Sequence, residues 1–375
     1  MRTVYSPVIK LRASEMQALK MLSLSTKNQI APIIQLLPKE GKIQQKDYLN
    51  KRIKELSEAF AGSTMNFYAD FDLLESSGTS NFSFMKTFLS MVSGIGINFV
   101  PVITQPQDTP RYRDLICNNY LANGICIKPP QYRLRNVSLD KLCTYLNKSL
   151  SSFIDHFKIN ESKVDILLDL NFIDHLDFEP TFDGFSLAEK MIHIIHGISN
   201  NKGYRSIIIA GGSFPKDLSD YGTDTETPIA RLEWDIWNTI VEGCSEITLR
   251  YSDYGNIHPE FDPNQESHPG TCSIKYTVDN NFLILKGKLS HRHENGHGQY
   301  ITKSNSLIAG SDYYGLDFSW GDRMIHDIAN GLASSGNAGK WVQFTLNHHM
   351  TLITHILGIS DGDVIPPFQL ALLMR

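Results

Sequence analysis

The sequence predicts one α/β domain, a (β/α)8 barrel of the TIM-barrel type with additional C-terminal elements. Three observations carry this prediction. Short apolar, β-branched segments recur eight times within residues 1–260, and stretches with helical apolar spacing separate them. The third observation is the absence of a glycine motif. An open doubly wound sheet, the competing fold, usually has a glycine-rich fingerprint after its first strand, but residues 10–15 contain no glycine. Eight repeats therefore favour closure into a barrel, and the open sheet stays as the alternative.

The eight predicted strands share the short apolar runs that are typical of parallel strands covered by helices. They are Val8–Leu11, Ile30–Leu37, Asn66–Leu74, Asn98–Thr104, Gly124–Lys128, Val164–Phe172, Ser206–Ala210 and Glu246–Tyr251. The helices predicted between them repeat apolar residues three or four positions apart. They are Ser14–Leu24, Gln45–Phe60, Ser83–Ser93, Leu139–Phe157, Leu187–Ser199 and Pro228–Glu242.

The pattern changes after the eight βα units of residues 1–260. Over 261–319 we expect an insertion that contains a β-hairpin, Ser273–Leu289 with its turn at 279–280, and a polar loop, His291–Gln299. Residues 320–375 return to helical spacing over Trp320–Leu332 and Gly339–Leu357. We therefore interpret 1–375 as a single barrel domain with a hairpin insertion and C-terminal helices.

Composition and charge narrow the classes of function. The net charge of −5 and the pI near 6.2 give no electrostatic reason to expect nucleic acid or an anionic membrane as a partner. No apolar stretch approaches the ~20 residues that span a bilayer, and the first residues lack the pattern of a signal peptide, so we expect a cytoplasmic protein. The five cysteines never form a CxxC pair, which argues against a disulfide framework and a structural zinc site.

Charged residues at the ends of the predicted strands form a candidate site, because parallel barrels carry their catalytic groups at the C-terminal strand ends. The candidate catalytic residues are Lys10, Asp70, Asp72, Lys128 and Asp169. Strand alternation places Asp70 and Asp72 on one face of their strand. By the same alternation Asp165, Asp169 and Asn171 share a face, as do Thr248, Arg250 and Ser252. We therefore expect acids beside the bases Lys10, Lys128 and Arg250 in the barrel mouth.

Two interpretations of these charges stay open. One is a functional site, with carboxylates for acid–base work or for Mg²⁺ and with bases for a small anionic ligand. The other is a network of buried charges that neutralise one another. The sequence identifies no metal and leaves open whether the protein is an enzyme.

A second set of residues completes the candidate ligand site. Gly211, Gly212 and Ser213 follow the seventh strand, where barrels often bind phosphate through backbone N–H groups, although a plain tight turn has the same sequence. Arg231 and Glu233 begin the next helix, where the arginine either clamps an anion or pairs with the glutamate. Arg250 and Asp253, at the end of the last strand, are the remaining candidates.

The histidines are interpreted as structural. His291, His293 and His297 have a spacing that can bind zinc or copper, but the surrounding sequence favours a solvated loop. His348 and His349 are adjacent on a predicted helix and point in different directions, so they cannot chelate one ion together. We expect one of them to bond to the barrel and the other to be exposed.

Several stretches, taken in order, resemble the "beta protein" family of phages and bacteria. They are PVIK (7–10), APII (31–34), DFDLL (70–74), AGGSFP (210–215), RLEW (231–234) and NHH (347–349) after Trp341. The resemblance covers essentially the whole chain. Gln35 departs from it, since a carboxylate is common there, and so does Val342, where arginine often follows the tryptophan.

The resemblance implies a context and not a reaction. Family members occur in phage, prophage and bacterial immunity regions, and one counters the toxicity of a neighbouring protein. The first hypothesis is therefore an accessory protein of phage–host conflict, in anti-phage defence or superinfection immunity, that senses or neutralises a protein partner encoded nearby. The alternative is a metal-assisted hydrolase or lyase that acts on a phosphorylated or nucleotide-like small molecule at the barrel mouth.

Overall fold

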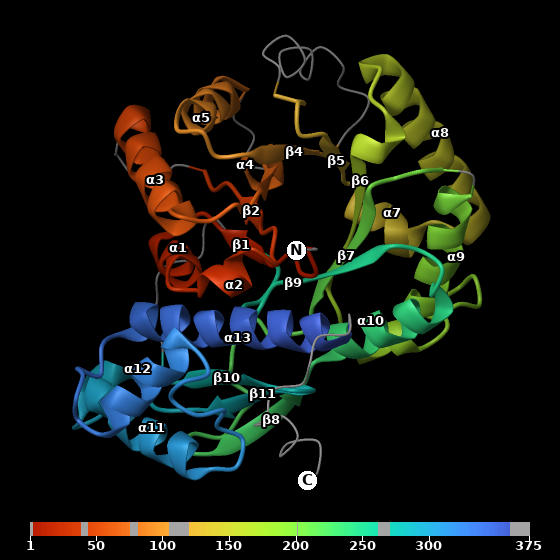
Figure 1. Cartoon of the computed structure of the whole chain (residues 1–375). Helices are drawn as coiled ribbons and strands as arrows, with labels where there is room; N and C mark the ends of the chain where they lie inside the picture. The colour runs from red at the N-terminus through yellow and green to blue at the C-terminus, as the bar shows by residue number, and fades with distance from the viewer. Residues whose placement is uncertain are drawn as a thin grey trace.

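The computed structural model describes residues 3–38, 44–75, 82–104, 120–200, 202–261 and 271–360. Eight parallel strands form one sheet in the order β1-β2-β3-β4-β5-β6-β7-β9 (Figure 1). A parallel bridge between Tyr5 and Tyr251 brings its two edges together, and the Ser6 amide donates to the Tyr251 carbonyl at 3.0 Å. The sheet is thus a nearly closed TIM-like barrel, which confirms the predicted fold class.

Helices surround the barrel. The strands are β1 (Val8–Lys10), β2 (Ile33–Gln35), β3 (Phe67–Asp70), β4 (Phe99–Ile103), β5 (Ile125–Ile127), β6 (Val164–Phe172), β7 (Ser206–Gly212) and β9 (Leu249–Asp253). The helices are α1 (Ala13–Lys20), α2 (Leu24–Lys27), α3 (Gln45–Phe60), α4 (Asp72–Glu75), α5 (Phe82–Gly94), α7 (Gln131–Asn136), α8 (Leu139–Phe157), α9 (Leu187–Ser199) and α10 (Leu232–Gly243). The bounds of α3, α8 and α9 are those predicted. For α9 the sequence specifies its own start, because Ser186 and Glu189 form a reciprocal capping box.

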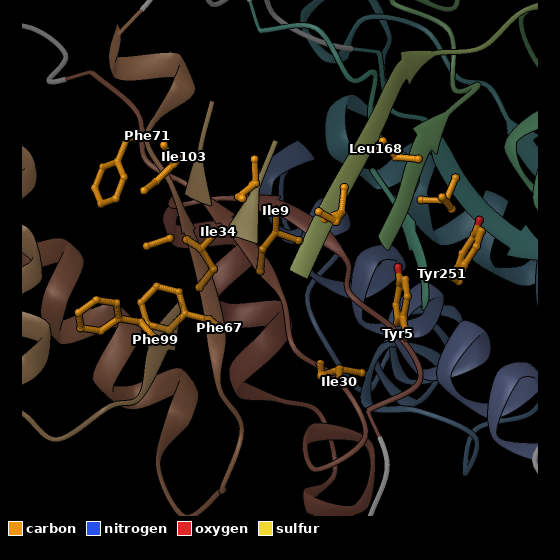
Figure 2. Packing of buried hydrophobic residues seen from close by; sticks show 14 of the residues in the cluster. Tyr5, Ile9, Ile30, Ile34, Phe67, Phe71, Phe99, Ile103, Leu168 and Tyr251 are labelled. Atoms are coloured by element: carbon orange, nitrogen blue, oxygen red, sulfur yellow. The ribbon is translucent and has the colours of Figure 1, made fainter. Parts of the chain in front are cut away.

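Strand alternation divides the buried residues into two layers. The outer layer packs the strands against the helices, and Figure 2 shows Ile9, Ile34 and Phe67 within it. The inner layer fills the barrel below its C-terminal end and includes Val8, Ile33, Tyr68, Val100, Leu167 and Ile208. Residues two positions later on the same strands, such as Lys10 and Gln35, therefore face the barrel interior near its C-terminal end.

Two predicted elements near the strand ends are wrong in detail. The predicted strand Asn66–Leu74 ends at Asp70, and a helical turn, α4, begins at Asp72. The predicted helix Pro228–Glu242 begins only at Leu232, because strand β8 (Glu226–Ala230) precedes it. β8 lies outside the barrel and pairs antiparallel with β11, where its alternation of exposed and half-buried residues gives one face to the protein and one to solvent.

The C-terminal part forms a second layer against the barrel. It contains the hairpin β10 (Ile274–Val278) and β11 (Asn281–Leu285), the 3-10 turns Ser290–Arg292 and Gly296–Gly298, and helices α11 (Gln299–Ala309), α12 (Trp320–Ala329) and α13 (Ala338–Ser360). The hairpin turns at Asp279-Asn280 as predicted. Helix α11 was not predicted, and its first residue, Gln299, lies in the predicted polar loop. In Figure 1, α13 runs between the barrel and the sheet of β8, β10 and β11.

Candidate functional site

Lys128, which directly follows β5, gathers three carboxylates at the C-terminal end of the barrel. Its Nζ lies 3.4 Å from Asp70 Oδ2, 3.1 Å from Asp72 Oδ2 and 3.0 Å from Asp169 Oδ2. Asp70 ends β3, and Asp169 lies in β6. Asp72 was predicted to lie on the same strand face as Asp70, but it reaches Lys128 from the first residue of α4. Its backbone amide donates to Asp70 Oδ1 at 3.0 Å. The structure thus brings together four of the five candidate catalytic residues.

Burial and the attraction between Lys128 and the carboxylates shift the pKa values of Lys128 and Asp70 in this cluster. Burial lowers the pKa of the Lys128 amine, but attraction to the three carboxylates outweighs it and leaves that pKa well above its ordinary value. Burial raises the pKa of Asp70, with Lys128 opposing and Asp72 adding to the shift. The Tyr254 hydroxyl also donates to both carboxylate oxygens of Asp169, at 2.9 and 2.8 Å. One ammonium and one phenol thus hold three acids.

The fifth candidate, Lys10, lies at the same opening, two strands away from Asp70. In the parallel registers Lys10 pairs with Gln35, and Gln35 pairs with Asp70, so these three residues stand in a row across β1, β2 and β3. Lys10 is buried, and its ammonium lies 6.0 Å from the centre of the Tyr254 ring. Within the described chain the Lys10 ammonium has no hydrogen bond or ion pair, and the buried Oε1 of Gln35 has no hydrogen-bond partner.

We call this whole set of residues the mouth. Its members are Lys10, Gln35, Asp70, Asp72, Lys128, Asp169 and Tyr254. Burial lowers the pKa of Lys10, with attraction to Glu15 opposing the shift. Burial also raises the pKa of Glu15, on α1, to about 7, although Lys10 and two arginines oppose it. The two lysines of the mouth therefore differ, since carboxylates compensate Lys128 and burial dominates at Lys10.

Arg250, predicted for the mouth, lies deeper in the barrel. It faces inward as predicted, and its Nη1 donates to the Tyr68 hydroxyl at 2.6 Å. Tyr68 donates to Asp165, which also binds Arg205 and Ser206. Leu167 stands between Asp165 and Asp169 on the inner face of β6, so an apolar layer separates this network from the mouth. Arg250 therefore does not join the bases of the mouth.

The remaining candidates form a second buried cluster, which we call the joint. Its members are Ser213, Arg231, Glu233, Asp253, Thr277 and His349. Arg231 Nε lies 3.2 Å from Glu233 Oε1, and its Nη2 lies 3.6 Å from Asp253 Oδ2. Of the two alternatives for Arg231, the structure therefore shows the ion pair with Glu233.

Asp253 is the centre of the joint and lies on the outer face of β9. It accepts from Tyr5 at 2.5 Å and from His349 Nε2 at 3.0 Å, while His349 Nδ1 lies 2.9 Å from Thr277 Oγ1. Burial raises the pKa of Asp253, but His349, Arg231 and the Tyr5 hydrogen bond outweigh it and lower that pKa to about 2. These contacts connect the barrel to α13 and the hairpin, away from the mouth.

The glycine turn after β7 holds an internal anion. The amide and hydroxyl of Ser213 donate to Glu233 Oε2 at 3.2 and 2.5 Å, so a carboxylate takes the N–H that was expected to bind phosphate. At Gly211 an added Cβ would lie 2.5 Å from Ile173 Cδ1, so the end of that side chain would have to move. At Gly212 an added Cβ would lie 3.0 Å from Pro259. A phosphate-binding role for this turn stays a prediction.

The NHH segment of α13 is buried throughout, so the expectation that one histidine is exposed is wrong. Asn347 donates to the Ala18 carbonyl of α1 and accepts from the Gly321 amide. His348 lies between Asp322 Oδ2 and the Thr277 carbonyl, each at 2.8 Å. No local pattern in the sequence indicated Asp322 or Thr277 as partners. Three consecutive residues thus fasten α13 to the barrel on one side and to the hairpin and α12 on the other.

No metal site emerges among the side chains that the structure describes: none of their His, Cys, Asp and Glu groups gather in threes in a way that would hold an ion. The HxHxxxH stretch instead uses His297 beside the Cys272 thiol at 3.7 Å, and His293 accepts from the Asn295 amide. Over the same residues, no helix has the length and apolar character needed to cross a membrane.

The fold and these contacts define a parallel α/β-barrel protein with a charged mouth and a buried joint. The family model described as Beta protein matches residues 5–355, so the chain belongs to the Beta protein family, as the sequence resemblance indicated. No curated protein matches it.

Two solved structures are weakly similar. A GH18 chitinase from Pseudoalteromonas aurantia has a TM-score of 0.33 and 9% identity, over 55% of this chain and 93% of that chain. The YdjI aldolase from Escherichia coli K12 has a TM-score of 0.31 and 8% identity, over 96% and 92%. Similarities this weak carry no argument about the reaction or ligand of this chain.

Proposed function

We propose that this chain is a cytoplasmic accessory protein of phage–host conflict that acts by binding a protein partner, which it senses or neutralises. The observation that carries the proposal is an exposed apolar surface on the connection between β6 and α9. Leu176 and Phe182 are 76% and 70% exposed, and Phe178 is also exposed. Single exposed apolar residues are ordinary, but three within seven residues on one loop are typical of an interaction site.

Hydrogen bonds and an ion pair fix this loop near both of its ends. Arg135 donates to the carbonyls of Leu170 and Phe172 at its start, and Lys190 pairs with Asp183 at 2.9 Å near its end. A short 3-10 helix, His175–Phe178, presents Leu176 and Phe178 and has a reciprocal capping box. Because the connection follows a barrel strand, it lies at the C-terminal face. Its acids at 174, 177, 179 and 183 favour a partner with basic residues around an apolar cleft.

The experiment compares three serine variants. Leu176→Ser and Phe182→Ser are tested beside Leu332→Ser, because Leu332 is 74% exposed but lies after α12. We expect the wild type and Leu332→Ser to change phage plating and to bind the product of a neighbouring gene, and the two loop variants to lose both effects. A wild type that changes plating for no phage and binds no neighbouring product would contradict the proposal.

The enzyme hypothesis has one observation in its favour. Three carboxylates from β3, α4 and β6 converge within 3.4 Å of a single point. That point, however, is the Lys128 ammonium, so in this arrangement the acids serve as partners of a lysine. Hydrolysis of a phosphorylated metabolite that requires Mg²⁺ and is lost in Asp70→Asn would support this second function.

A further inference from the structure

Within the described part of the chain, the Lys10 ammonium and the Gln35 Oε1 atom have no hydrogen bond or ion pair. The two residues are Cα partners in the β1–β2 register, and their chain neighbours Ile9 and Ile34 belong to the outer layer, so both side chains face the barrel interior. Asp70, Asp72, Lys128, Asp169 and Tyr254 are all engaged with one another. The ammonium and amide oxygen at the end of β1 and β2 are not.

Unpartnered polar groups of this kind are rare in protein interiors. Lys10 is 5% exposed, and its ammonium has the Tyr254 ring and the attraction of Glu15 but no ion pair or hydrogen bond among the described residues. The buried Oε1 of Gln35 has no hydrogen-bond partner there either. Burial alone does not make Lys10 special, since Lys27 is 4% exposed and also has no side-chain hydrogen bond or ion pair within the described chain. Lys27, however, lies on α2 before β2 begins, whereas Lys10 adjoins a second unpartnered group at the barrel opening.

The charges of the mouth define the ligand that would complete this pair. Lys10 requires an anionic acceptor, and Gln35 Oε1 requires a hydrogen-bond donor. Three carboxylates already share the single charge of Lys128, so a dianion next to them would be repelled more strongly than a monoanion. Lys10 and Gln35 are Cα partners on neighbouring strands, which lie about 4.8 Å apart, so one small molecule that carries an acceptor and a donor close together can contact both side chains.

We propose that Lys10 and Gln35 bind the α-hydroxy acid group of a small monocarboxylate, with the carboxylate on the Lys10 ammonium and the hydroxyl donating to Gln35 Oε1. This site is independent of the partner surface at Leu176 and of any role in phage conflict. It also separates the two lysines of the mouth. Lys128 forms ion pairs with three carboxylates of the protein, and Lys10 binds the carboxylate of the ligand.

The test is a binding comparison on the full chain. Glycolate, acetate and inorganic phosphate are titrated at equal ionic strength, with heat of binding and melting temperature as readouts. Glycolate should bind more tightly than acetate, and phosphate should give no more than chloride. Lys10→Met should weaken glycolate binding by about tenfold or more, because it removes a charged hydrogen bond. Gln35→Met should make glycolate and acetate equal, and Lys27→Met should leave both affinities unchanged.

Each other outcome overturns the site. Phosphate binding more tightly than glycolate would mean that the mouth prefers a dianion. Glycolate affinity that is the same in wild type, Lys10→Met and Gln35→Met would place any carboxylate binding elsewhere, and no binding by the folded wild type would remove the proposal. Because methionine fills the volume of either side chain, the two variants test the site separately. A loss of phage activity in the Leu176→Ser variant with intact glycolate binding would separate this inference from the proposed function.

Discussion

The mouth and the joint are both buried clusters of charged residues, but they differ in how completely their polar groups are paired. In the joint, Arg231 contacts Glu233 and Asp253, and Asp253 also binds Tyr5 and His349. In the mouth, Lys128 forms ion pairs with three carboxylates, whereas Lys10 forms no ion pair with any residue that the structure describes. Complete pairing is what a structural network requires, and incomplete pairing is what a ligand site leaves for its ligand.

The position of each cluster agrees with this difference. The joint lies where the barrel, α13 and the hairpin meet, since Asp253 belongs to β9, His349 to α13 and Thr277 to β10. Three stretches that carry the family resemblance, AGGSFP, RLEW and NHH, contribute residues to it. We infer that these motifs preserve the assembly of the two layers, and that ligand preference depends on residues outside them, such as Gln35.

The largest expected effect is in the joint. Arg231→Met should destabilise the protein by about 3–5 kcal/mol, because it leaves the carboxylates of Glu233 and Asp253 buried without their cation. Urea unfolding measures this loss. Arg323→Met is the control, since Arg323 pairs with Asp317 in solvent, and it should cost less than about 1 kcal/mol. Equal losses for the two variants would show that the joint is not a structural network.

Local patterns predicted most of the barrel, because each βα unit carries its own periodicity and caps. The bounds of α3, α8 and α9 follow from apolar spacing within single segments. β8 was missed because an exposed strand of five residues next to a helix start has no strong pattern. Its pairing with β11 depends on residues 51 to 59 positions later in the chain.

The candidate site was predicted less well, for a related reason. Strand alternation placed Asp169 at the barrel mouth, and its position at a strand end placed Lys10 there. Which acid meets which base, however, depends on the ends of several strands at once. The sequence therefore could not decide whether these acids form a ligand site or, as the ion pairs with Lys128 show, neutralise a base of the protein itself. Alternation already contained the signal for Asp253, because a residue three positions after Arg250 on the same strand faces the opposite side.

The next largest expected effect is a pH dependence of stability at Glu15, whose carboxylate attracts Lys10 of the mouth. The pKa of Glu15 is raised from 4.5 to about 7 in the folded protein. Between these values the folded state holds a proton that the unfolded chain has released, so this group's contribution to stability is complete below pH 4.5 and is lost as the pH rises to 7. Glu15→Gln should therefore be more stable than the wild type by roughly 2–3 kcal/mol at pH 8 and nearly equal at pH 4.

The measurement for Glu15→Gln is urea unfolding at the two pH values, with the exposed Glu179→Gln as control. Asp253 in the joint has the opposite sign, because its pKa is lowered to about 2, and its contribution is lost only as the pH falls from 3.8 through 2. A Glu15→Gln variant with the same difference from wild type at pH 4 and pH 8 would show that Glu15 does not titrate in this range.

The smallest expected effect is a change in stability that has opposite signs for substitutions of the two mouth lysines, Lys10 and Lys128. At pH 5, where the buried Glu15 carboxyl is protonated, Lys10→Met should stabilise the ligand-free protein by about 1 kcal/mol. It replaces a buried amine, which has no ion pair or hydrogen bond among the described residues, with an apolar side chain of similar length. Lys128→Met should destabilise it, since three carboxylates would lose their shared cation. Melting temperatures of both variants decide the matter. If Lys10→Met is more stable than the wild type and no longer responds to glycolate, the lysine lowers stability and is kept for binding. If Lys10→Met is less stable, Lys10 belongs with Lys128 to one structural network.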